Sequence, residues 1–87
     1  MTSIELSFSK TYPLGKLYSV RFILVMGHEH NDDDSIFVEF IPLDISSKLR
    51  EFLLRCDLFE KAHRDFDKSR LKFVKAYYAE RYKALYQ

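Results

Sequence analysis

The chain has 87 residues, of which 47% are hydrophobic and 16% aromatic, and its formal net charge is +1. This length predicts one domain, residues 1–87, and this composition excludes an intrinsically disordered chain. The near-zero net charge also argues against a protein that binds nucleic acid through its overall charge.

The cysteine content and the apolar runs bear on where the protein resides. The single cysteine, Cys56, excludes an intrachain disulfide and fits a reducing compartment. Residues 1–5 have neither the basic segment nor the apolar run of a signal peptide. The longest apolar run, residues 22–26, is too short to span a membrane. We therefore expect a cytoplasmic protein with no membrane association.

Apolar and polar residues alternate at the start of the chain. Ile4, Leu6 and Phe8 are separated by polar residues, which predicts a half-exposed antiparallel edge strand. Residues 12–15, Tyr-Pro-Leu-Gly, predict a turn, because proline suits the second position of a turn and glycine the fourth.

Two further strands are predicted after this turn. Residues 17–26 become apolar on both faces toward their end, as expected for a central strand. Residues 36–41 form the third strand, which Pro42 stops because proline has no N–H to donate to a ladder. Residues 1–43 are therefore predicted to form a three-stranded antiparallel meander.

Residues 44–87 contain no glycine or proline, and their apolar residues recur at helical spacing. Four phenylalanines lie seven residues apart, at Phe52, Phe59, Phe66 and Phe73. Asp44 is a suitable N-cap, and Asp57 with Glu60 resembles a capping box. The sequence allows one bent helix or two helices, and we favour two, over residues 45–55 and 58–86. The prediction is an α+β fold with the order β-β-β-α-α.

The second predicted helix would be about 43 Å long, more than a short sheet can cover. Its latter half adds a second apolar stripe beside the phenylalanines, at Leu71, Val74, Tyr78, Tyr82 and Leu85. The surplus apolar surface should pack on the short helix, a second copy or another protein. We expect a homodimer or partner interface formed by Phe66, Phe73, Tyr77, Tyr78, Tyr82 and Leu85.

An acidic segment lies between the second and third predicted strands. Its carboxylates are predicted to bind a basic surface of a partner protein, through Glu29, Asp32, Asp33 and Asp34. The histidines His28 and His30, together with these carboxylates, are suitable atom types for a divalent metal, but their spacing matches no metal motif. A solvated loop is the simplest interpretation, and we predict no metal and no cofactor.

Lysines follow one face of the second predicted helix within about 80°. They are Lys61, Lys68, Lys72, Lys75 and Lys83. Such a stripe can follow a phosphate backbone, with nearby tyrosines stacking on bases. Asp65 interrupts it, and few arginines accompany it, so nucleic-acid binding is the alternative hypothesis and a solvated helix face the simplest interpretation.

Motifs for catalysis are absent from the sequence. It has no glycine-rich phosphate loop, no nucleophile elbow and no C-x-x-C pair. We therefore expect a non-enzymatic protein-binding domain. Small aromatic-rich domains of this kind are common among inhibitors and adaptors, including those of phages and mobile elements, although no residue here points to such a source.

Overall fold

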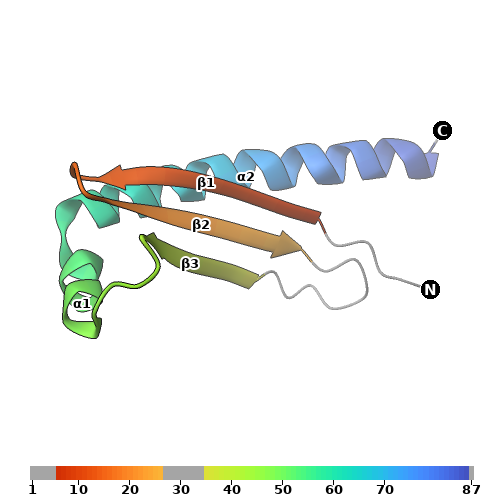
Figure 1. Ribbon diagram of the computed structural model, residues 1–87. Coiled ribbons are helices and arrows are strands. Elements are labelled where there is room, and N and C mark those ends of the chain that lie inside the picture. The colour runs from red at the N-terminus through yellow and green to blue at the C-terminus, as the bar shows by residue number, and fades with distance from the viewer. Residues whose placement is uncertain (1–5, 27–34, 87) are drawn as a thin grey trace.

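Three antiparallel strands are followed by a short helix and a long helix, in the predicted order (Figure 1). The computed structural model describes residues 6–26 and 35–86. The elements are β1 (Leu6–Leu14), β2 (Tyr18–Met26), β3 (Ser35–Ile41), α1 (Ser47–Arg55) and α2 (Asp57–Tyr86). The predicted α+β fold class is confirmed.

The strand order is β1-β2-β3, so β2 is the central strand, as predicted. The register pairs Phe22 with Lys10 of β1 and with Val38 of β3. Alternate residues of β2 point to the face that α2 covers, and these are buried: Val20, Phe22, Leu24 and Met26. This alternation places the core between the sheet and α2.

The predicted turn at residues 12–15 is wrong, because β1 continues to Leu14 and the turn follows at residues 15–17. Pro13 pairs with Ser19 within the strand. An edge strand tolerates proline, since its missing N–H can lie on the open side. Gly15 has a φ of 84°, a left-handed conformation that glycine adopts without steric cost.

Residues 35–86 contain two helices, as predicted, and they separate at Cys56. The Cys56 backbone is extended (φ −80°, ψ 153°), and its N–H donates to the Leu53 carbonyl over 3.2 Å. Its own carbonyl accepts from the N–H groups of Phe59 and Glu60. The acidic side chains of Asp57 and Glu60 lie in the first turn of α2, where the helix dipole favours negative charge.

The N-cap of α1 is Ser46, and the prediction of Asp44 is wrong. The Ser46 hydroxyl accepts a hydrogen bond from the Leu49 N–H over 3.2 Å. Both residue types suit an N-cap, so the sequence alone does not discriminate between two candidates two residues apart.

Phenylalanines of α2 stack on phenylalanines of the sheet. Phe66 lies 5.2 Å from Phe22 between ring centroids, and Phe73 lies 4.7 Å from Phe8. Phe59 lies 5.6 Å from Phe22. The seven-residue spacing thus places three rings on the sheet, and we call these five residues the phenylalanine ladder. Phe66 is completely buried (0% exposed).

The fourth phenylalanine of the series, Phe52, does not join the ladder. It lies on α1 and is 67% exposed. The break at Cys56 redirects the chain, so a repeat that continues in sequence does not continue in space. α1 instead buries Leu53, with Ile45 and Leu49 partly buried against the core.

The long helix lies over β1 and β2 and leaves part of β3 uncovered (Figure 1). A helix about 10 Å wide spans roughly two strands that are about 4.8 Å apart. Ile36 and Val38, on the α2 side of the sheet, are exposed as a result, and Phe37 is exposed on the opposite face.

The packing of the phenylalanines predicts different losses in the free energy of unfolding for two chemically identical substitutions. Phe66→Ala should lower the free energy of unfolding by about 3–5 kcal/mol, because it removes a fully buried ring. Phe52→Ala, at an exposed site, should change it by no more than about 0.5 kcal/mol. Urea denaturation of both variants tests this, and equal losses would contradict the described packing.

Candidate functional site

The C-terminal part of α2 extends beyond the sheet (Figure 1). Among residues whose side chains are described, Tyr77 is the last hydrophobic one that packs against the core. Every described side chain that follows it, at positions 78–83, is exposed. This part of α2 therefore has no covering layer within the described chain.

Apolar side chains form a line along the outer side of α2 that continues into this uncovered part. Leu71, Tyr78 and Tyr82 lie within about 40° of one another around the axis. All three are exposed, and Tyr82 reaches 64% exposure. We call these three residues the outer stripe. Its spacings of seven and four residues place the side chains on one face, as in helices that pack on other helices.

The residues predicted to form the helix interface are divided by the structure. Phe66 lies in the chain's own core, so it is removed from the interface. Phe73 and Tyr77 are half-buried against the same core. Only Tyr78 and Tyr82 of the predicted set are exposed on the helix surface, and the side chain of Leu85 lies outside the described part of the structure.

Hydrogen bonding and ring packing hold the aromatic side chains at the start of this segment. The Arg81 guanidinium donates to the Tyr77 hydroxyl over 3.1 Å. The Tyr77 and Tyr78 rings meet edge to face, with centroids 5.2 Å apart. These contacts favour defined side-chain positions, which lowers the entropy lost when a partner binds.

The five lysines predicted as a nucleic-acid surface are all exposed: Lys61, Lys68, Lys72, Lys75 and Lys83. Asp65 is exposed as well, whereas Asp67 is half-buried and lies 3.5 Å from Arg70 and 3.8 Å from His63. The surface of α2 is thus basic but carries interspersed carboxylates.

The predicted acidic cluster, Glu29, Asp32, Asp33 and Asp34, lies outside the described residues, as do His28 and His30. Within residues 6–26 and 35–86, no group of three or more His, Cys, Asp or Glu side chains could hold a metal ion. None of the helices described is long and apolar enough to cross a membrane.

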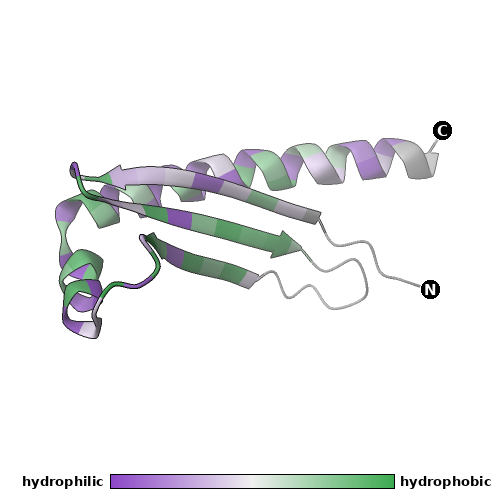
Figure 2. Cartoon of the chain, in the orientation of Figure 1, coloured by the Kyte–Doolittle hydropathy of each residue, from purple (hydrophilic) through white to green (hydrophobic). Residues whose placement is uncertain are grey.

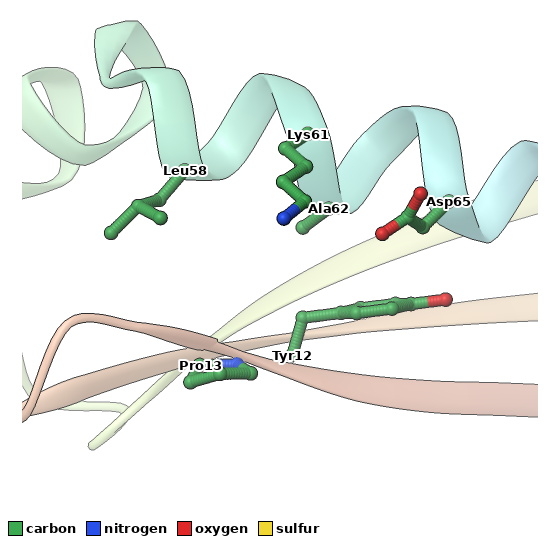
Figure 3. A pocket seen from close by; sticks show the side chains of 6 residues that line it. All are labelled: Tyr12, Pro13, Leu58, Lys61, Ala62 and Asp65. Atoms are coloured by element: carbon green, nitrogen blue, oxygen red, sulfur yellow. The ribbon is translucent and has the colours of Figure 1, made fainter.

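A recess between β1 and α2 was not anticipated from the sequence. Its volume is about 180 Å³, and it is lined by Tyr12, Pro13, Leu58, Lys61, Ala62 and Asp65. Figure 3 shows the Tyr12 ring below α2, with its hydroxyl on the side of Asp65. Tyr12 lies on the same inward face of β1 as Phe8 and Leu14, but the mistaken turn at residues 12–15 concealed this pattern.

The Tyr12 hydroxyl is buried, and no described side chain meets it in hydrogen-bonding geometry. Burial raises the pKa of Tyr12 above its ordinary value of 10.0; the nearby Ser69 side chain opposes this shift, and the Asp65 carboxylate adds to it. Lys61 and Asp65 are exposed, so water screens their charges. The recess therefore presents no buried charge to a ligand, and we assign it a packing role.

Comparisons with known proteins give no family or relative for this chain. No protein-family model, curated protein or solved structure matches it.

Replacing Tyr12 tests the account of its hydroxyl. Tyr12→Phe should leave the free energy of unfolding at pH 7 unchanged or higher, since it removes a buried hydroxyl without a hydrogen-bond partner. Because the folded state holds the phenol proton more tightly, wild-type stability should fall as pH rises above 10 through the raised pKa. Denaturation of both proteins at pH values from about 8 to about 11, a range around the ordinary tyrosine pKa of about 10, measures how the free energy of unfolding changes with pH.

The variant should lose less stability than wild type across that range. Parallel stability curves for the two proteins would contradict the assigned role of burial at Tyr12.

Proposed function

We propose that this chain is a non-enzymatic protein-binding domain, an inhibitor or adaptor, whose binding surface is the outer stripe of α2. One observation carries the proposal: Leu71, Tyr78 and Tyr82 are exposed on one face of a helix that extends beyond its own sheet. Aromatic side chains held on a helix supply much contact area with few rotatable bonds, and tyrosine is enriched at interfaces.

The shape of this surface favours a helical partner. The outer stripe is straight and narrow, with apolar side chains at intervals of seven and four residues. A partner helix with apolar residues at the same spacing would pack along it. Lys75 and Lys72 lie beside the stripe, so acidic residues flanking the apolar face of the partner would be favoured.

Three further elements belong to the proposal. The acidic residues 29–34 form a second contact with a basic surface of the target. The protein acts in the cytoplasm, which its single cysteine supports. It also self-associates as a homodimer, since exposed apolar residues occur on β3 as well as on α2.

Substitution of the outer stripe should weaken partner binding without unfolding the domain. We expect Leu71→Ala/Tyr78→Ala/Tyr82→Ala to weaken binding by about 2 kcal/mol or more, as for clustered interface residues. Alanine preserves helix propensity, so circular dichroism should not change. The partner is first captured from a lysate of the source cell, with nuclease present, and its affinity for purified variants is then measured by titration calorimetry.

Leu17→Ala provides the control, because Leu17 is 78% exposed at the turn between β1 and β2. It removes an exposed apolar side chain away from α2 and should leave affinity unchanged. Equal affinities of the triple variant and wild type for the captured protein would refute the role of the outer stripe.

Nucleic-acid binding is the second candidate function, and the exposure of all five lysines of the stripe favours it. In that case Lys68→Glu/Lys72→Glu/Lys75→Glu should abolish binding to RNA or DNA oligonucleotides. The wild-type association constant should fall steeply with salt, with a logarithmic slope of about −0.9 per phosphate contacted on duplex DNA. Fluorescence anisotropy over a salt series measures both effects, and absence of binding by wild type at low salt would exclude this function.

A further inference from the structure

Strand β3 is an edge strand with an uncovered apolar segment. Ile36, Phe37 and Val38 are consecutive, so they project to both faces of the sheet, and each is more than 40% exposed. Figure 2 shows hydrophobic residues along most of β3. The outer edge of such a strand presents backbone N–H and C=O groups that can pair with another strand.

The opposite edge of the sheet is protected. Strand β1 contains Pro13, which has no N–H, and Lys10, whose ammonium donates to the Ser69 hydroxyl over 3.2 Å. Its other face carries Ser7, Ser9 and Thr11. Proline and lysine on edge strands are devices that prevent strand addition, and β3 contains neither. Within residues 6–26 and 35–86, the sheet therefore has one protected edge and one open edge.

We propose that β3 pairs antiparallel with β3 of a second copy of this chain, which produces a two-fold dimer with a continuous six-stranded sheet. This inference rests on the homodimer of the proposed function and assigns its surface to β3 instead of α2.

Symmetry and side-chain matching select one register for this pairing. In a two-fold antiparallel pair whose faces match, the axis must pass through one residue of the strand. An axis at Phe37 places the two Phe37 rings opposite each other and Ile36 opposite Val38 of the second copy. It also places Glu39, the one charged residue of β3, opposite Ser35. An axis at Val38 would instead place Glu39 against Phe37, so the Phe37 axis is favoured.

The position of α2 is compatible with this dimer. Because each α2 lies over β1 and β2, the two helices would be about four strand spacings, or ~19 Å, apart. This separation exceeds the diameter of about 10 Å of a helix, so the helices would not clash.

Pairing of β3 with β3 also limits the assembly to two copies. The remaining outer edges of the six-stranded sheet would both be β1, which is protected, so strands would not continue to add. The interface would be confined to the seven residues of β3, a small contact compared with the ~1,200 Å² or more that stable interfaces bury, so dimerisation should depend on concentration within the micromolar to millimolar range.

Sedimentation equilibrium of the full chain up to about 1 mM tests the dimer (a range set by weak affinities). Wild type should show a monomer–dimer equilibrium, and Phe37→Lys should weaken it by about tenfold or more, because two ammonium groups would face each other. Leu17→Lys makes the same kind of change at the exposed turn and should leave the equilibrium unchanged. A wild-type monomer throughout this range, or a dimer that Phe37→Lys does not weaken, would overturn the proposal.

Cysteine cross-linking tests the register in a Cys56→Ser background, where serine retains a donor for the Leu53 carbonyl. Under mild oxidation Phe37→Cys should form an interchain disulfide, since residues facing each other on paired strands have Cβ atoms about 4.5–5.5 Å apart. Glu39→Cys should not, because the two residues at position 39 would be ~14 Å apart along the strands. Equal cross-linking at the two positions would refute the Phe37 axis.

The result separates this inference from the proposed function. A dimer that is lost in the outer-stripe variant but retained in Phe37→Lys would overturn the β3 interface and leave a homodimer through α2. Partner binding that is lost in the outer-stripe variant but retained in Phe37→Lys would support the proposed function independently of the dimer.

Discussion

The stacking of α2 phenylalanines on the sheet determines how the rest of this structure is arranged. The ladder fixes α2 over β1 and β2, with Phe66 on Phe22 and Phe73 on Phe8. A single helix covers two strands, so a three-stranded sheet retains an uncovered strand at one side. The same helix is longer than the sheet, so its final turns project beyond it. The exposure of the outer stripe and that of Ile36 and Val38 follow from this one packing arrangement, whereas Phe37 is exposed on the opposite face of the sheet.

Much of the fold could be predicted from residue patterns because those patterns reflect local physical constraints. Alternation identified the strands, and the central position of β2 followed from Ile23 and Val25 on its second face. The predictions were wrong where a residue suits two local structures equally well or where two residues suit the same position. Pro13 suits a turn as well as an edge strand, and Asp44 suits an N-cap as well as Ser46 does. Tertiary contacts determine which alternative forms, and these contacts cannot be inferred from a single sequence.

The candidate site was predictable only in part. The sequence indicated that α2 carries more apolar surface than the sheet could bury, and Tyr78 and Tyr82 are exposed. It did not indicate which ring of the heptad series faces the core, because Phe52 and Phe66 occupy equivalent positions in the repeat yet lie at opposite extremes of burial. The open edge of β3 was also hidden, since an apolar strand in sequence resembles a covered one. Recognising it required knowledge of which strands the helix covers.

The contact between Phe8 and Phe73 has a consequence for how the chain acquires its structure. These rings are 4.7 Å apart in space but 65 positions apart in the sequence, and they join the first described strand to the long helix. During synthesis the three strands emerge well before the helix that covers them, at roughly 5–20 residues per second. The apolar face of the meander therefore remains accessible to water and to chaperones until α2 is complete. The β and helical parts of this chain thus share one core, and a nascent sheet depends on residues that are translated last among those that form this core.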